Sequence, residues 1–271
     1  MFTRQEVFPG IYHISDAMGV SFTLVTGSER ALLVDTGYGL EDVAAYIRTV
    51  TSLPVDVLLT HGHHDHVLGA RWFSSVRMSA EDLPVFRLRT AAAQRKQVLK
   101  QAAAKGLSAP DDFITAPIPD PEPIGFDRTV AGFPCTVYRL GGLDALILQV
   151  PGHTPGSVLV FIPEYGLLLT GDDWNPCTWM WFPESLDVHT WRKNMQAVLP
   201  AVEKETGAGI RQVLCSHQPA PRESTELREY LDYMNDDRLA SAPSVDMNSP
   251  IRTCQAACPD RGWVLIFDAE K

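Results

Sequence analysis

The chain has 271 residues, of which 45% are hydrophobic, and a formal net charge of −10. This composition can fill a large core, and the acidic balance argues against nucleic acid as a partner because phosphate backbones would be repelled. The N-terminal sequence lacks the features of a signal peptide, and no apolar run approaches the roughly 18 residues of a membrane span. The five cysteines favour free thiols in a reducing cytoplasm, although pairing of Cys254 with Cys258 stays open.

The first part of the chain alternates apolar runs with segments of helical spacing. Strands are predicted at residues 21–27, 31–37 and 54–60, and helices at 40–50 and 67–73. The first two strands are expected to form a hairpin. This order indicates a layered α/β fold.

Residues 81–105 keep the three-four spacing of a helix, which Arg95 interrupts. Six basic residues gather in this segment: Arg87, Arg89, Arg95, Lys96, Lys100 and Lys105. A solvated helix face is the favoured interpretation, and a lid or subunit contact that attracts an anionic substrate is the alternative. With the Pro-rich connection that follows, the segment predicts a helical insertion at about 81–123 within a single domain over residues 1–271.

The second part of the chain repeats the pattern of strands followed by helices. A hairpin is expected over residues 128–140, with its turn near Phe133 and Pro134, and a second hairpin from strands at 157–163 and 165–171. Further strands are expected at 144–150, 210–216 and 261–267, and helices at 189–204 and 222–239.

Four buried strands deliver a side chain capable of binding metal where the chain leaves the strand. These residues are His61, His153, Asp172 and His217. Layered sheets build their sites at strand ends, because a rigid scaffold there aims side chains into a shared crevice. Imidazole and carboxylate ligands suit zinc, iron and related ions, so the sequence predicts a metal site.

The stretch HGHHDH at residues 61–66 holds half of the eight histidines. His61 and His63 lie two apart, so an extended backbone points both to one side. Asp65 and His66 come where the chain turns into the next helix and are expected to face a second ion. His64 points away and is expected to be a loop residue that does not bind metal.

The combined motifs resemble the metallo-β-lactamase superfamily. THGHHDHVLG matches its H-x-H-x-D-H signature, and LLVDTG, PGHTPGS, TGDDW and SHQ follow in the family order. The resemblance implies a four-layer αββα sandwich with metals at the edge of the two sheets. It further implies that His61, His63 and His153 bind one ion.

By the same resemblance, Asp65, His66 and His217 bind a second ion, and Asp172 bridges the two. Asp35 is similar to the buried carboxylate that supports a ligand histidine in this family. The expected cofactors are two divalent ions, with zinc favoured and iron or manganese as alternatives. His13 and His189 lie outside the motifs and are expected to be structural.

The implied reaction is hydrolysis of an ester, thioester, lactone or related bond by a hydroxide shared between two metals, with Asp65 as proton shuttle. One alternative is iron-dependent oxygen or sulfur chemistry like that of persulfide dioxygenases, and a second is a phosphodiesterase or nuclease. A sensor with an intact site is a third, non-enzymatic alternative.

Aromatic residues follow two of the motifs: Trp72, Trp174, Trp179, Trp181 and Phe182. They form either a small core cluster or the apolar wall of a substrate pocket. The second interpretation predicts a small-molecule substrate with an apolar or aromatic portion. No membrane partner is expected, and a homo-oligomer stays open.

Overall fold

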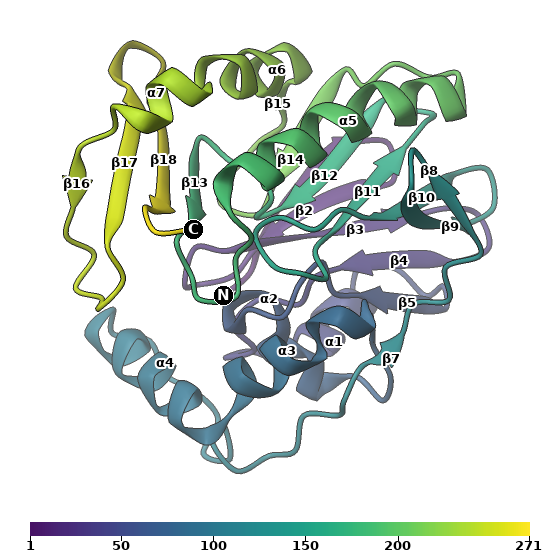
Figure 1. Ribbon diagram of the computed structural model, residues 1–271. Helices are drawn as coiled ribbons and strands as arrows, with labels where there is room; N and C mark the ends of the chain where they lie inside the picture. The colour runs from purple at the N-terminus through teal and green to yellow at the C-terminus, as the bar shows by residue number, and fades with distance from the viewer. The chain divides into compact units, whose positions relative to one another are not determined.

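The computed structural model describes residues 1–271, which divide into two compact units. Unit 1 comprises Met1–Gly125, Val137–Ala145 and Ser216–Ala220, and unit 2 comprises Phe126–Thr136, Leu146–Cys215 and Pro221–Lys271. Each unit combines β-sheet with helices, which confirms the predicted mixed α/β class (Figure 1). A single domain over the whole chain stays a prediction.

Unit 1 contains a seven-stranded sheet whose spatial order follows the chain order. Its strands are β1 (Thr3–Phe8), β2 (Ile11–Ser15), β3 (Ser21–Thr26), β4 (Ala31–Val34), β5 (Val55–Leu58), β6 (Arg77–Met78) and β7 (Glu122–Pro123). Its helices are α1 (Val43–Arg48), α2 (His64–Val67), α3 (Leu83–Thr90) and α4 (Ala92–Ala104), with 3₁₀ turns η1 (Leu68–Trp72) and η2 (Ala80–Asp82). Strands β3 and β4 form the predicted hairpin, whereas β4 and β5 are parallel.

The core of unit 1 joins one side of this sheet to α1, α2 and α3. Leu33 and Val57 of the sheet belong to one buried cluster with Ile47, Val67 and Phe86 of the three helices. Burial of side chains of this size contributes roughly 1.5–3 kcal/mol each. The packing fixes the segments on both sides of the loop that follows β5.

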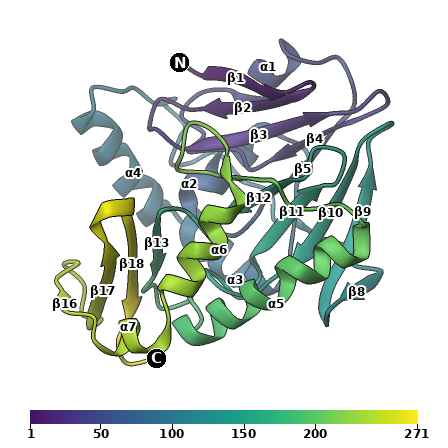
Figure 2. The same ribbon diagram turned by 90° about the horizontal axis from the view of Figure 1, so that it is seen from above.

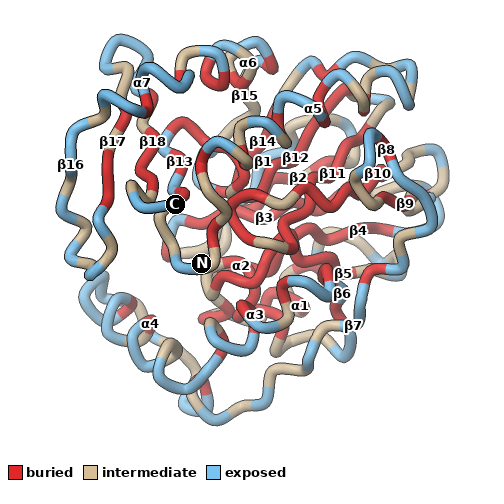
Figure 3. The backbone as a smooth tube through the Cα atoms, in the orientation of Figure 1, coloured by how far each residue is buried: buried red, intermediate tan, exposed pale blue.

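The helix expected over residues 81–105 is instead two helices. Ala91 between α3 and α4 is extended, with φ −59° and ψ 153°. Arg95 explains the break, because its Nε donates to the carbonyl of Thr90 at the end of α3, and its Nη1 donates to the carbonyls of Phe113 and Ala116. Arg95, which interrupts the apolar stripe, is therefore a structural residue whose guanidinium binds carbonyl groups of the surrounding chain. In Figure 3, most of α4 is exposed or half-buried.

Unit 2 contains most of a second seven-stranded sheet and a smaller four-stranded sheet. The first has the order β15-β14-β12-β11-β10-β9-β8 and the second the order β13-β18-β17-β16. The strands of the first sheet are β8 (Arg128–Val130), β9 (Phe133–Arg139), β10 (Asp144–Gln149), β11 (Val158–Ile162), β12 (Leu167–Gly171), β14 (Gln212–Cys215) and β15 (Arg222–Glu223). Those of the second are β13 (Cys177–Met180), β16 (Ser244–Val245), β17 (Thr253–Cys258) and β18 (Trp263–Asp268).

The helices of unit 2 are α5 (Val188–Thr206), α6 (Ser224–Tyr233) and α7 (Asp236–Ala240), with the 3₁₀ turn η3 (Pro259–Arg261). Helix α5 lies along the larger sheet (Figures 1 and 2). It buries Trp191, Met195, Val198 and Val202, whose spacing is that of one helical face. The segment expected to be one helix at 222–239 is divided into α6 and α7.

The small sheet was not expected from the sequence. Its strand β13 pairs in parallel with β18, from Cys177 opposite Val264 to Met180 opposite Phe267. The aromatic segment after Asp172 therefore contains a strand, and this strand determines which of its side chains face the core.

Candidate metal centre

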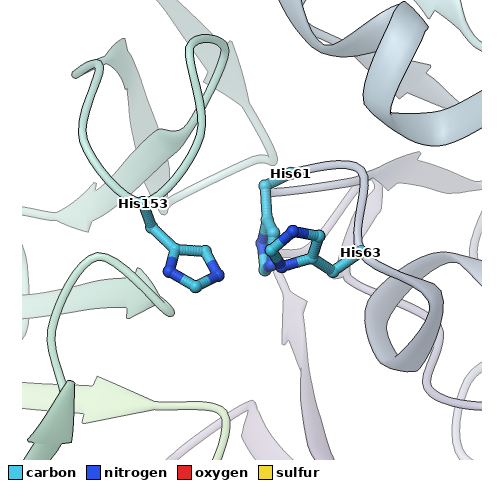
Figure 4. Close-up of side chains that lie close together, drawn as sticks. All are labelled: His61, His63 and His153. Atoms are coloured by element: carbon cyan, nitrogen blue, oxygen red, sulfur yellow. The ribbon is translucent and has the colours of Figure 1, made fainter. Parts of the chain in front are cut away.

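The histidine loop follows β5 and bends at residues 60–62 before α2 begins, so the extended chain expected between His61 and His63 is wrong. His63 is the N-cap of α2, with φ −72° and ψ 145°. The imidazole rings of His61 and His63 lie with centroids 4.8 Å apart, and both side chains are buried (Figure 4). Asp65 and His66 follow within α2 itself.

A second group of ligand atoms in unit 1 comes from Asp65, His66 and His217. Asp65 Oδ2 lies 3.7 Å from Nε2 of His66 and 3.7 Å from Nε2 of His217. One ligand atom from each of these three residues lies within 4.8 Å of those of the other two. Two imidazoles and a carboxylate at this separation could hold a metal ion.

The loop that carries His217 is fastened to strands β2 and β3. The Ser21 amide donates to the carbonyl of Ser216 over 2.8 Å. His13 Nε2 donates to the carbonyl of Gln218 over 2.9 Å, and burial lowers the pKa of His13. His13 is thus a buried structural residue, as expected, and it fixes the residue that follows His217.

Asp35 organises the histidines from the end of β4. Because β4 and β5 are parallel, their carboxyl ends share one edge of the sheet, and Asp35 Oδ1 accepts the amide of Thr60 over 2.7 Å. Asp35 Oδ2 accepts Nδ1 of His66 over 3.0 Å. Asp35 itself has φ 66°, a left-handed conformation that Asp tolerates better than most residues.

These hydrogen bonds determine which ring nitrogen carries the proton. A carboxylate only accepts, so Nδ1 of His66 is the donor and Nε2 is the unprotonated nitrogen. The hydroxyl of Thr60 donates to Asp35 at 2.8 Å, so its oxygen accepts Nδ1–H of His61 over 3.0 Å. Asp35 therefore sets the tautomer of His66 directly and that of His61 through Thr60.

In unit 2, His153 lies in the PGHTPG loop after β10 (Figure 4). Its Nδ1 donates to the carbonyl of Trp179 over 2.7 Å, which again makes Nε2 the unprotonated nitrogen. Nε2 lies 3.8 Å from Oδ2 of Asp172, which follows β12. Asp173, the next residue, accepts the amide of His153 over 2.8 Å.

The candidate ligands have the chemistry of a site for divalent metal ions. His61, His66 and His153 all have Nδ1 engaged by a fixed acceptor, which is the arrangement that orients a ligating imidazole. Carboxylates accompany them, and no cysteine is among the ligand candidates. This chemistry suits zinc, iron or manganese.

His64 differs from its neighbours in the loop. Its ring is half-buried and lies edge-on to Tyr38, with centroids 5.5 Å apart. Burial lowers the pKa of His64. His64 is in neither group of candidate ligands, in agreement with the sequence interpretation.

Asp82, which supports the histidine loop, was missed in the sequence. Asp82 is fully buried, and its Oδ2 accepts the amide of Gly62 over 2.6 Å. A Cβ on Gly62 would lie 2.6 Å from the backbone nitrogen of Phe86 in α3, so only glycine fits at this approach. The start of the expected insertion therefore supports the histidine loop. No local pattern relates Asp82 to Gly62, which lies twenty residues earlier.

The basic residues of the 81–105 segment are partly accounted for by contacts within unit 1. Arg87 pairs with Asp120 at 2.5 Å, and Lys105 Nζ donates to the carbonyl of Met18 over 2.8 Å. In these two residues the positive charge is engaged by groups of unit 1. A lid role for the segment stays a prediction.

The aromatic residues expected to form a pocket wall do not behave alike. Trp174 is 0% exposed and lies edge-on to Tyr230 in the core, so it is not a wall residue. Trp72 packs against the core of unit 1, and its Nε1 donates to the carbonyl of Gly39. Trp179, Trp181 and Phe182 form a cluster of their own in unit 2.

All five cysteines are free. Cys254 and Cys258 lie four residues apart on strand β17, where successive residues rise about 3.3 Å, so they are too far apart for a disulfide. No helix is both long and apolar enough to cross a membrane.

The sequence profile of the metallo-beta-lactamase superfamily matches residues 15–207. The chain belongs to this superfamily. Among solved structures, a metallo-beta-lactamase from Pontibacter korlensis superposes with a TM-score of 0.56 and 18% identity, over 86% of this chain and 98% of that one. This likeness supports the fold alone.

Two curated proteins are similar in sequence to this member of the metallo-β-lactamase superfamily. A protein of Streptococcus pyogenes named "Probable metallo-hydrolase" is 25% identical over 170 residues, which cover 62% of this chain and 66% of that protein. Acyl-coenzyme A thioesterase MBLAC2 of Gallus gallus is 28% identical over 206 residues, covering 65% and 69%. The chain therefore spans about two thirds of the length of these relatives.

Proposed function

We propose that this protein is a metal-dependent hydrolase that cleaves an ester, thioester or lactone bond of a small molecule. The observation that carries the proposal is the set of buried histidines whose Nδ1 atoms are fixed by hydrogen bonds, so that Nε2 is the ligating nitrogen. We assign His61, His63 and His153 to one ion, and Asp65, His66 and His217 to a second. Asp172 would contribute its carboxylate to both ions.

Two bound divalent ions would lower the pKa of a shared water to about 7 and so supply a hydroxide at neutral pH. The chain supplies the orientation: Asp35 and Thr60 hold His61 and His66, and the carbonyl of Trp179 holds His153. Near-complete burial of His61 and His66 keeps bulk water from competing for these positions.

Asp65 is assigned a second task besides metal binding. Its carboxylate accepts a proton from the attacking water and passes it to the departing alcohol or thiol, which leaves as the neutral product. The position of Asp65 Oδ2, at 3.7 Å from Nε2 of both His66 and His217, supports this role. The name of the thioesterase relative supports an acyl bond as the target.

The test combines elemental analysis with a substrate panel of p-nitrophenyl esters, S-acyl thioesters, a lactone and bis(p-nitrophenyl) phosphate. We expect two zinc equivalents per chain, hydrolysis of the acyl substrates, loss of activity on chelation and recovery when zinc is returned. His189→Ala is the matched control, because His189 is an exposed histidine paired with Asp236. This variant should retain both metals. Full activity in metal-free protein would overturn the proposal. Bound iron with oxygen uptake would instead support iron chemistry, and cleavage of the phosphodiester alone a phosphodiesterase.

A further inference from the structure

Three aromatic side chains of unit 2 form one continuous cluster. The rings of Trp181 and Phe182 stack with centroids 4.6 Å apart, and Trp179 lies 5.9 Å from Trp181 and 6.1 Å from Phe182. Trp179 is 39% exposed, which makes it one of only three large hydrophobic residues exposed in the chain. Trp181 and Phe182 are half-buried beside it. We call these three residues the aromatic cluster.

The aromatic cluster is in contact with His153. The ring of Phe182 meets the imidazole edge-on, with centroids 5.6 Å apart, and the carbonyl of Trp179 accepts Nδ1–H of His153. The hydroxyl of Ser185 donates to the carbonyl of His153 over 2.8 Å. The cluster thus begins directly beside a residue assigned to the metal centre.

The segment that carries the cluster is held rigid from both sides. Trp179 lies in β13, which is paired with β18. Lys271 Nζ donates to the carbonyls of Phe182, Pro183 and Ser185 at 2.7–3.0 Å. The three hydrogen bonds use all the donors of this ammonium group and hold residues 182–185 in place.

We propose that Trp179, Trp181 and Phe182 are the subsite for the apolar acyl portion of the substrate, a medium-length aliphatic or aromatic acyl group. The proposal rests on the proposed function and extends it to the part of the substrate that does not react. Exposed indole rings offer a large apolar area without a charge, so they favour a hydrocarbon chain over a short or charged acyl group. A rigid wall loses little conformational freedom on binding, which increases its selectivity.

The experiment compares p-nitrophenyl octanoate with p-nitrophenyl acetate in the zinc-loaded protein. The ratio of kcat/KM for the octanoyl over the acetyl ester should be roughly tenfold or more, since each buried methylene of a substrate contributes to discrimination. Trp179→Ala and Trp181→Ala should each reduce this ratio at least about threefold, mainly through KM of the octanoyl ester. Trp179→Phe should keep most of it.

Leu88→Ala is the matched control, because Leu88 is another large exposed apolar residue, 64% exposed on α3. This variant should keep the wild-type ratio. Circular dichroism and thermal unfolding identify any variant that fails to fold, and the other alanine variant then carries the comparison.

A second measurement needs no turnover: calorimetric titration of the zinc-loaded protein with octanoate and with acetate. Octanoate should bind at least about tenfold more tightly, and Trp181→Ala should remove the difference. Ester hydrolysis without a preference for chain length, together with equal binding of both acids, would overturn the subsite and leave the proposed function standing. Absence of hydrolysis on every ester, thioester and lactone of the panel, with octanoate binding lost in the variants, would overturn the proposed function and keep the subsite.

Discussion

The carboxylate of Asp35 accepts Nδ1–H of His66 over 3.0 Å, and both side chains are almost completely buried. Asp35→Asn should therefore lower zinc affinity about 10–100-fold, the usual effect of removing the residue that orients a ligating imidazole. Competition with a chromophoric zinc chelator measures the change. Asp56→Asn is the control, because Asp56 on β5 pairs with Arg30 and should leave the affinity unchanged. Equal affinity in Asp35→Asn and wild type would show that Asp35 does not orient the ligands.

Thr60 transmits the effect of Asp35 to His61 through its hydroxyl. Thr60→Val keeps the shape but removes this hydroxyl, so metal affinity should fall, whereas Thr60→Ser should restore it. Nuclear magnetic resonance of the imidazole nitrogens provides an independent measurement, since Thr60→Val should change the tautomer balance of His61. A Thr60→Val protein with wild-type affinity and tautomers would contradict the chain of hydrogen bonds.

His64 and His66 make a matched pair of histidines separated by one residue. His66→Ala should lose or weaken one metal equivalent, because it removes an assigned ligand. His64→Ala should keep both, because His64 is in neither ligand group. Elemental analysis after dialysis against a weak chelator distinguishes the two. Loss of metal in His64→Ala with retention in His66→Ala would reverse the assignment.

The contacts of Gly62 with Asp82 and α3 predict a separate loss of stability for a substitution at each of the two residues. Gly62→Ala should destabilise the fold by about 1–3 kcal/mol, because the new Cβ meets the backbone of Phe86. Asp82→Ala should cost about 1–3 kcal/mol by leaving the amide of Gly62 unsatisfied, whereas Asp82→Asn keeps an acceptor and should cost less. Urea unfolding measures these values, with the exposed Asp111→Ala as control. Equal stability of Asp82→Ala and Asp111→Ala would contradict the role of Asp82.

Burial lowers the pKa of His13 from its ordinary value of 6.5, although its hydrogen bond to Gln218 opposes this shift. Below pH 6.5 the unfolded chain therefore binds a proton that the folded chain does not, so stability should fall as the pH falls. The contribution of one proton reaches at most about 1.4 kcal/mol per pH unit. In unfolding measured from pH 7.5 to 5.5, His13→Gln should lose less stability than wild type. An identical decline would show that His13 does not titrate differently on folding.

The sequence predicted those parts of the site that follow from strand ends and local spacing. His61 and Asp172 come directly after apolar runs, and the spacing of two residues indicated that His61 and His63 lie together. The extended chain assumed between these two histidines is wrong, because residues 60–62 form a bend. Contacts between residues far apart in the sequence could not be predicted. Asp82 meets Gly62 only because α3 packs against the loop, and no spacing in the sequence records that contact.

The errors in the predicted elements also have physical causes. In the sequence Arg95 interrupts the apolar spacing of one expected helix. In the structure its guanidinium binds the carbonyl at the end of α3 and so stabilises the break between two helices. Strand β17 reads TCQAAC and lacks the apolar run that identifies a strand, so the small sheet was missed. Without that sheet, the sequence could not show that Trp174 lies in the core whereas Trp179 lies at the surface.

The hydrogen bond from His153 to the carbonyl of Trp179 has a consequence for how this protein can change over evolution or in the laboratory. The same residue contributes its side chain to the aromatic cluster and its main chain to the orientation of a candidate ligand. A substitution that reshapes the surface for a new substrate, and in doing so moves this backbone, will also rotate the imidazole. Substrate preference and metal affinity are therefore coupled traits, and variants selected for one should be assayed for the other.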